Sequence, residues 1–457
     1  MTVAPSLRWP IGGMLAVLTA YGLVSLPGMV AVWRPAVPGI AVLLAWTALA
    51  LLALPLSRPR TIAVTRIAAI AAIIALRVAF AFLSADRVSP GDPNSYMLLA
   101  EGLRAGHGLK IYEPFFAAEY RALFPPGYPL LFAGWGLVFG FTTASLVVLN
   151  TLTDLAAAGL VMALGKRLGH EGAGRAAGFV YLIWPSALFS APLAQKESLC
   201  ILLVVALAVI WLALAERRLG GWRGAVLLGG TAGLLALSQP GWAPIAALFG
   251  LVFVRRFGVT GLVRAGVPGA LVAGLVMLPW WVRNWMVLHT FVPLTTSGGA
   301  SLWIGNNPDA TGNWMPPRDD LRGLSELEYG KRAGAIARDW IAHNPAAFVK
   351  LTAQKFLRAG GIAVFGLTRL DAMKPPLGPV LSAALFPLSY LTHLAMLGGG
   401  AVAAARIRHS TLLLLLLACF AQLLLFGVWF EFGERHREFL TPFLLLLAAM
   451  VFAPKRG

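Results

Sequence analysis

Long apolar runs bounded by Arg, Gly and Pro recur along most of this 457-residue chain. About 20 apolar residues in a helix are enough to cross the ~30 Å hydrocarbon layer of a membrane. The runs predict helices at 11–32, 38–56, 62–83, 127–142, 145–165, 176–193, 198–215, 225–238, 242–254, 266–284, 378–400, 411–430 and 439–453. The pattern therefore predicts an all-α, polytopic transmembrane protein with about 12 to 13 membrane segments.

Two longer polar stretches interrupt this pattern, at 84–126 and 285–377. In the first, Asp92 can cap a helix that has Pro93 at its first position. Three apolar side chains then share one face of that helix, namely Tyr96, Leu99 and Leu103. We expect a short amphipathic helix that lies on the membrane surface.

The second polar stretch predicts two more amphipathic helices. Ser325 and Glu328 fit a capping box. Apolar positions follow at helical spacing, at Tyr329, Ala333, Ile336 and Trp340. A further helix is expected to start at Asn344, with Pro345 at its first position. Both polar stretches are therefore predicted to be folded.

Composition excludes an ordinary soluble globule, because only 12% of the residues are charged and 58% are hydrophobic. A soluble domain has about 25% charged residues. The cysteines, Cys200 and Cys419, lie within Leu-rich runs and give neither a disulfide framework nor a zinc-binding spacing.

The formal net charge is +18, and the basic residues that cause it follow the positive-inside pattern of membrane proteins. The charge therefore indicates the orientation in the membrane, and no nucleic acid partner is predicted. The loops predicted to be inside carry Arg58, Arg60, Lys166, Arg167, Arg217, Arg218, Arg223, Arg255, Arg256, Arg406, Arg408, Lys455 and Arg456. Of the 19 carboxylates, all but Asp154, Glu171 and Glu216 lie in segments predicted to be outside. Both termini are expected to be cytoplasmic. This requires that one apolar segment between Pro125 and Gly165 does not fully cross.

Two carboxylates in the outer segments are candidates for chemistry. Asp92 opens the predicted surface helix, where it can reach both a lipid headgroup and a water-soluble acceptor, although Asp before Pro is also a common helix cap. Glu197 lies in a tight outer turn, where a polar residue needs no function. Brought together, they could provide a general base or bind a divalent metal such as Mg or Mn.

Other polar residues have a structural and a functional interpretation. Asp154 is an intramembrane carboxylate and so a functional candidate, or it simply bonds Asn150 or a neighbouring backbone group. Five cations are predicted at the outer boundary, namely Arg283, Lys350, Lys355, Arg435 and Arg437. They could bind a phosphate headgroup, or they could simply extend their charged ends to the membrane surface. His107 and His436 are expected to be solvated. The sequence contains no motif of a zincin, a P-loop ATPase, a Rossmann enzyme or an α/β-hydrolase.

Several segments in order resemble the polyprenyl-phosphate-dependent glycosyltransferases of the membrane-embedded GT-C fold, which include protein O-mannosyltransferases and lipid A aminoarabinose transferase. The similar segments are DPNSYMLLAEGLRAG, RALFPPGYPLLFAGW, LPWWVRNWMVL, FVPLTTSGGASLWIGNNPDATGNW, HNPAAFVKLTAQKF and ERHREFLTPFLLLLAA. The resemblance runs from about residue 62 over most of the chain. Glu197 falls where members carry a second outer-face acid.

The resemblance implies transfer of a sugar, with inversion, from a polyprenyl-phosphate-linked donor to a hydroxyl of a glycan, lipid or protein acceptor. The reaction would take place at the outer, periplasmic face of a bacterial inner membrane, with Asp92 as general base. Donor-phosphate and substrate binding would fall to Tyr96, Arg121, Tyr128, Arg283, Lys355 and Arg435. Phe124 and Ser95 stand where relatives often carry basic residues. Arg121, Arg283, Lys355 and Arg435 are therefore expected to bind the donor phosphate in their place.

The resemblance also divides the chain. Residues 1–61 are two added N-terminal helices, and 62–284 is a GT-C-like core that includes the outer loop 84–126. The outer-face loop 285–377 and the C-terminal helices 378–457 follow.

The main alternative is a transporter or lipid flippase with a mid-membrane site near Asp154. A non-catalytic scaffold of the cell envelope is a further alternative. A cavity beside Asp92 would favour transfer, whereas a central cavity around Asp154 would favour transport.

Overall fold

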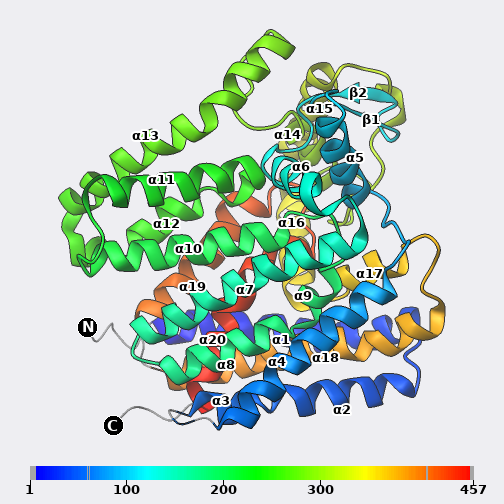
Figure 1. The fold of residues 1–457 in the computed structure, drawn as a ribbon. Helices are drawn as coiled ribbons and strands as arrows, with labels where there is room; N and C mark the ends of the chain where they lie inside the picture. Colours follow the sequence, from blue (N-terminus) through cyan, green and yellow to red (C-terminus); the bar gives the residue numbers. More distant parts are fainter. Residues whose placement is uncertain (1–6, 59, 61, 408–409, 453–457) are drawn as a thin grey trace.

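A computed structural model describes residues 7–58, 60, 62–407 and 410–452. Within these residues the chain is almost entirely helical, and the only named strands form one antiparallel hairpin. The prediction of an all-α fold is confirmed (Figure 1).

The N-terminal half contains α1 (Arg8–Trp33), α2 (Pro38–Ala50), α3 (Ala53–Ser57), α4 (Ala63–Leu83), α5 (Asp92–Arg104), β1 (Ile111–Glu113), β2 (Ala118–Tyr120), α6 (Gly127–Phe139), α7 (Thr143–Arg167), α8 (Glu171–Leu182), α9 (Pro185–Ser190), α10 (Glu197–Ala215) and α11 (Gly221–Ser238). The C-terminal half contains η2 (Pro240–Trp242), α12 (Ile245–Val252), α13 (Val254–Leu288), α14 (Gly298–Gly305), η3 (Asp319–Leu321), α15 (Glu326–His343), α16 (Pro345–Gly361), α17 (Phe365–Asp371), α18 (Pro379–Arg406), α19 (Ser410–Gln422), η4 (Leu423–Gly427), η5 (Glu434–Leu440) and α20 (Thr441–Phe452).

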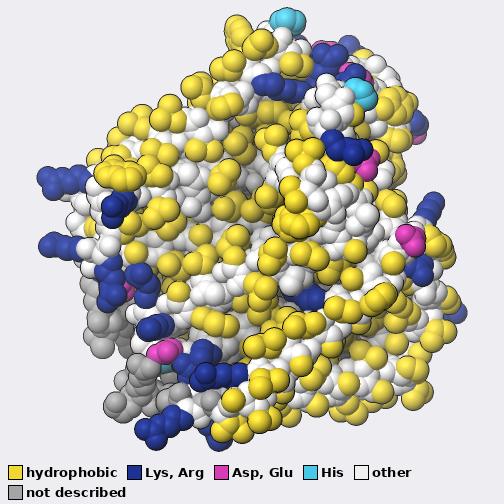
Figure 2. All heavy atoms as spheres, viewed as in Figure 1, with side chains coloured by type: hydrophobic (Ala, Val, Ile, Leu, Met, Phe, Trp, Pro, Cys, Tyr) yellow, Lys and Arg dark blue, Asp and Glu magenta, His cyan; other side chains and the backbone are white. Residues whose placement is uncertain are grey.

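Each apolar run predicted from the sequence coincides with one helix or with two consecutive ones. In the described part of the chain, seven helices are long and apolar enough to cross a membrane, namely α1, α2 with α3, α4, α7, α10, α13 and α18. Figure 2 shows a broad belt of hydrophobic atoms over these helices, with charged side chains gathered mainly beyond it. The chain is thus a multi-pass membrane protein.

The remaining apolar runs form shorter or interrupted helices. The run at 176–193 is divided into α8 and α9, because Pro185 starts a new helix. Helix α6 has 13 residues, and at 1.5 Å per residue it extends about 20 Å, which is less than the hydrocarbon thickness. A segment between Pro125 and Gly165 that is too short to cross agrees with the charge argument from the sequence.

Basic residues mark one end of the bundle. Lys166 and Arg167 stand in the last turn of α7, and Arg217 and Arg218 follow the end of α10. Near the start of α1, Arg8 donates to the carbonyl of Ala405. Figure 2 shows Lys and Arg side chains, in dark blue, gathered at this end of the bundle, at the left and lower left of the view. The predicted inner residues Arg408, Lys455 and Arg456 lie outside the described residues.

An ion pair lies inside the helix bundle. Arg77 of α4 lies 2.8 Å from the Asp154 carboxylate of α7, and both side chains are almost completely buried. The same guanidinium donates to the carbonyl of Leu182, and the hydroxyl of Tyr181 donates to Asp154. Asp154 therefore links α4, α7 and α8, with partners other than the expected Asn150.

The opposite end of the bundle, which is the predicted outer end, carries the two polar stretches. Figure 1 shows α5, the hairpin, α14 and α15 gathered there. The predicted helix starts of the second stretch are confirmed: Ser325 accepts from the backbone N–H of Glu328, and Asn344 precedes a helix that starts with Pro345. Only half of the predicted capping box forms, because the Glu328 carboxylate accepts from Arg332 instead. The hairpin pairs Ile111 with Tyr120, an element that the sequence analysis did not predict.

Candidate active site

Asp92 is the first residue of α5, and its carboxylate is free of any capping role. Gly91 occupies the N-cap position with φ of +77°, so the prediction that Asp92 caps the helix is wrong. A side chain at Gly91 would also crowd Arg369, whose Nη1 would lie 3.0 Å from its Cβ. The glycine thus lets Arg369 approach the start of the helix beside Asp92.

Arg435 of η5 forms an ion pair with the Asp92 carboxylate. Its guanidinium also lies 3.5 Å from Glu431. The ring of Phe365 at the start of α17 lies under two cations, Arg369 at 5.3 Å and Arg435 at 5.9 Å. Three segments distant in sequence therefore meet at Asp92.

The charges around Asp92 keep it ionised. Burial alone would raise the pKa of this carboxyl, but Arg435, Lys196 and Arg369 together outweigh burial and lower the pKa to about 2. The same environment lowers the pKa of Arg369, mainly through burial, against the opposing charge of Asp92. Asp92 is thus a carboxylate at physiological pH, surrounded by cations.

The second predicted acid, Glu197, begins α10 and reaches the same site. It is 7% exposed, and its Oε2 has no hydrogen-bond partner. The preceding residue, Lys196, lies 5.6 Å from the ring centre of Tyr96. Glu197 and Arg435 line one hollow, so the structure brings both predicted acids near the same arginine.

This hollow lies beside the Asp92–Arg435 pair and is too narrow to hold a water molecule. Its lining comes from α10, η5 and the junction of α11 with η2, and consists of Lys196, Glu197, Cys200, Gln239, Trp242, Arg435 and His436. Trp242 is 4% exposed, and its indole Nε1 also has no hydrogen-bond partner. Two of the lining residues, Glu197 and Trp242, thus each carry a buried polar atom without a hydrogen-bond partner.

Two predicted tyrosines form the wall of the site on its α5 side. Tyr96 and Tyr128 are each 1% exposed and meet edge to face, with ring centres 5.6 Å apart. Phe124 packs on Tyr96 from the other side at 5.2 Å. Burial, followed by the nearby Asp92, raises the pKa of the Tyr96 hydroxyl, which therefore stays protonated.

Three other predicted cations make contacts away from Asp92. Arg121 forms an exposed ion pair with Glu119, 3.3 Å away. Arg283 donates to the carbonyls of Arg121 and Leu109. Lys355 is completely buried, and its ammonium donates to three oxygens, those of Gly305 and Phe430 in the backbone and of the Asn306 side chain. In the structure these cations hold the outer segments together.

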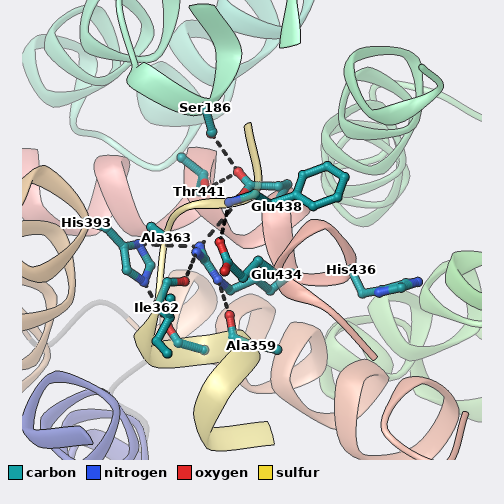
Figure 3. A network of polar contacts seen from close by, with 12 residues as sticks. Ser186, Ala359, Ile362, Ala363, His393, Glu434, His436, Glu438 and Thr441 are labelled. Atoms are coloured by element: carbon teal, nitrogen blue, oxygen red, sulfur yellow. Dashed lines mark hydrogen bonds and ion pairs between the residues drawn. The ribbon is translucent and has the colours of Figure 1, made fainter. Parts of the chain in front are cut away.

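The turn that carries Arg435 is anchored on its other side. Arg437 donates to the carbonyls of Ala359 and Ile362. Glu434 accepts from the first backbone N–H groups of α17, at 2.6 and 2.8 Å. Figure 3 shows Ala359, Ile362 and Glu434 close together, with His436 pointing away from them. These contacts therefore fix the position of Arg435 relative to α17.

Three site residues were missed by the sequence analysis, namely Lys196, Arg369 and Glu431. Lys196 had one signal, its position directly before Glu197. His436 was expected to be solvated, yet it is half-buried beside Phe432. Burial lowers its pKa to about 4 despite the nearby Glu431, so it is a neutral imidazole at physiological pH.

A divalent metal was predicted at Asp92 and Glu197, and it would need further ligands close to these two carboxylates. In the described ranges, no group of three or more His, Cys, Asp or Glu side chains could hold a metal ion. Asp92 and Glu197 supply two carboxylates at most, and Arg435 lies between Asp92 and Glu431.

Comparisons with known proteins find similarity at the level of the fold. No protein-family model matches the chain. No curated protein matches it either.

Several solved structures of the oligosaccharyltransferase from Archaeoglobus fulgidus are similar. One, in complex with Zn and sulfate, has a TM-score of 0.48 and 18% identity, over 82% of this chain and 48% of that chain. Another, AglB with an inhibitory peptide and a dolichol-phosphate, has a TM-score of 0.46 and 15% identity, over 83% and 50%. A third, tethered to an acceptor peptide, has a TM-score of 0.47 and 16% identity, over 83% and 49%.

The chain thus spans about half the length of these structures.

Proposed function

We propose that this protein is a membrane glycosyltransferase that moves a sugar from a polyprenyl-phosphate carrier to an acceptor hydroxyl. The proposal rests above all on one observation: the Asp92 carboxylate pairs with Arg435, which with Lys196 and Arg369 keeps it ionised. A carboxylate among cations supplies both a proton acceptor and the positive charge that a phosphate leaving group requires.

In the proposed reaction, the three cations bind the donor phosphate. The acceptor hydroxyl loses its proton to Asp92 while its oxygen attacks the anomeric carbon of the sugar. The bond from that carbon to the phosphate oxygen breaks, and the electron pair leaves with the lipid phosphate. Arg435, Lys196 and Arg369 stabilise the charge that develops on that oxygen. Attack opposite to the leaving group inverts the configuration.

The Asp92–Arg435 pair also sets the order of events. A carboxylate with a pKa of about 2 is a weak base. A phosphate that engages Arg435 would weaken its pairing with Asp92 and so strengthen the base. Asp92 would thus become an effective proton acceptor only when the donor is bound.

The site is placed at the periplasmic face of a bacterial inner membrane, with both termini in the cytoplasm. The distribution of charge supports this orientation, because the ends of α7 and α10 far from Asp92 carry Lys166, Arg167, Arg217 and Arg218. The site begins at the other end of α10, at Glu197.

Transport through a site near Asp154 is less well supported. That carboxylate is fully buried and paired with Arg77, in the manner of a structural ion pair. Asp154 is not among the residues that line the hollow beside Arg435.

The test is transfer from radiolabelled polyprenyl-phosphate sugars to a membrane and envelope extract, with the protein in nanodiscs. Asp92→Asn keeps the shape of the side chain and removes the base, so it should lower kcat by about 100-fold to 10,000-fold. Glu119→Gln is the matched control, an outer carboxylate that pairs with Lys110 and Arg121 instead. Full activity of folded Asp92→Asn would overturn the assignment of the base.

A further inference from the structure

Arg435 is shared between two carboxylates. Its Nη1 pairs with Asp92, and its Nη2 lies 3.5 Å from Glu431. Burial alone would lower the pKa of Arg435, but Asp92, Glu431 and Glu197 outweigh burial and raise it. Asp92 has a role in the proposed reaction as the base. The second carboxylate, Glu431, has none so far.

The backbone around Glu431 is fixed to the outer segments. The N–H of Glu431 donates to the carbonyl of Ser301 in α14, at 2.9 Å. The carbonyl of the preceding residue, Phe430, accepts from the buried ammonium of Lys355 at 3.2 Å. A side chain at Gly305 would collide with the backbone of Phe430 and Glu431, so α14 packs directly against this segment. Glu431 therefore stays in place when the partners of Arg435 change.

The proposed transfer changes the charge at the site. The donor is a phosphodiester with one negative charge. When the bond to the sugar breaks, the phosphate keeps the electron pair, and the proton of the acceptor hydroxyl passes to Asp92. The product is a phosphate monoester with a charge of about −1.5 to −2 at pH 7. Asp92 is then neutral, so the cations would hold the product more tightly than the donor.

Glu431 is the carboxylate that balances Arg435 after this step. In the described ranges of the chain, Arg435 has two carboxylate partners within ion-pair distance, Asp92 and Glu431. Once Asp92 carries the proton, Glu431 alone of these two is charged. Its charge weakens the attraction of Arg435 for a phosphate, and its contact keeps the guanidinium from following the phosphate out of the site.

We infer that Glu431 is a positioning residue that holds Arg435 throughout the reaction and lets the lipid phosphate product leave. This inference rests on the proposed glycosyl transfer and extends it to the step after the chemistry. Glu431 acts through Arg435 and touches neither the sugar nor the acceptor.

The experiment compares the wild type with Glu431→Gln, which keeps the shape of the side chain and removes its charge. In nanodiscs, the inhibition constant of polyprenyl phosphate should fall by about 10-fold. The Kd of the donor should fall by a smaller factor of about 3, because the donor carries less negative charge than the product. kcat should fall with a burst in the first turnover, since release becomes limiting. A merely structural defect would weaken the binding of both ligands.

Two further variants control for other causes. Asp320→Asn is the matched control, because Asp320 is an outer carboxylate that pairs with another arginine, Arg318, at 2.6 Å. It should leave both constants unchanged. Glu431→Asp keeps the charge but sets it back by one methylene, so it should tighten product binding by only about 2-fold. The same variant decides the question if Glu431→Gln does not fold.

The outcomes separate the two proposals. If no donor supports transfer by the wild type, the proposed function fails. If the wild type transfers sugar but the folded variants bind polyprenyl phosphate as the wild type does, or more weakly, the role in release is overturned and the proposed function stands. Equal tightening of donor and product would show an effect on phosphate binding in general, and it would likewise overturn the inference.

Discussion

Asp154→Asn removes one charge of the buried ion pair between α7 and α4. It leaves Arg77, which is 3% exposed, as a cation inside the bundle with the carbonyls of Leu182 and Ala187 as its remaining acceptors. Breaking a buried pair on one side costs about 3–5 kcal/mol. The two carbonyls retain part of the stabilisation, so we expect a loss of about 3 kcal/mol in the free energy of unfolding.

A second variant tests the cause of that loss. Replacing both charges, as Arg77→Met with Asp154→Leu, removes the pair without leaving a buried charge, and such replacements are often neutral or stabilising. The double variant should therefore be more stable than Asp154→Asn. The exposed pair of Glu328 and Arg332 is the control, and Glu328→Gln should leave the free energy of unfolding nearly unchanged.

The assay is reversible unfolding in mixed detergent micelles, followed by circular dichroism and combined into a double-mutant cycle. Equal stability of the wild type and Asp154→Asn would refute the structural role of the pair. An Asp154→Asn variant that folds normally and loses all function would instead support the transport interpretation.

Three further predictions concern the outer end. Burial lowers the pKa of Lys355 to about 8, so the native state loses this proton before the unfolded chain does. Unfolding measured between pH 8 and 10.5 should show stability rising by about 3 kcal/mol in the wild type and not in Lys355→Met. Arg435→Gln removes the strongest charge that opposes burial at Asp92, so the acid limb of the pH–rate profile should move to higher pH. An unchanged limb would show that another group controls it. Gly91→Ala forces an L-residue to a φ of +77° and should lower stability by about 1–2 kcal/mol in thermal unfolding, whereas Gly230→Ala, with open space around it, should not.

Hydrophobic pattern and local capping were sufficient to predict most helices. Ser325 and Asn344 start α15 and α16 as expected, because a cap depends on residues within one turn. The cap at Asp92 was predicted wrongly since its carboxylate has a stronger partner, Arg435, which lies 343 residues away in the sequence. Local rules contain no information on such a partner.

The site could be predicted only in part for the same reason. Asp92 and Glu197 stood out as acids in outer segments, and the structure brings both to Arg435. Arg369 lies on α17, and Glu431 lies just before η5. No sequence motif indicates that the fold brings these two segments to Asp92. Lys355 looked like a phosphate ligand, but the positions of Asn306 and Phe430, set by tertiary packing, surround it with oxygens.

Neighbouring side chains of the short turn η5 have two different roles, anchoring the turn and contacting Asp92. Arg437 and Glu434 anchor it to α16 and α17, while Arg435 faces Asp92. The positive field at the site is therefore set before a donor arrives, and little side-chain entropy remains to be lost on binding. Changes at Glu434, which stands behind the site, would loosen that field and weaken donor binding through entropy without removing any contact to the donor.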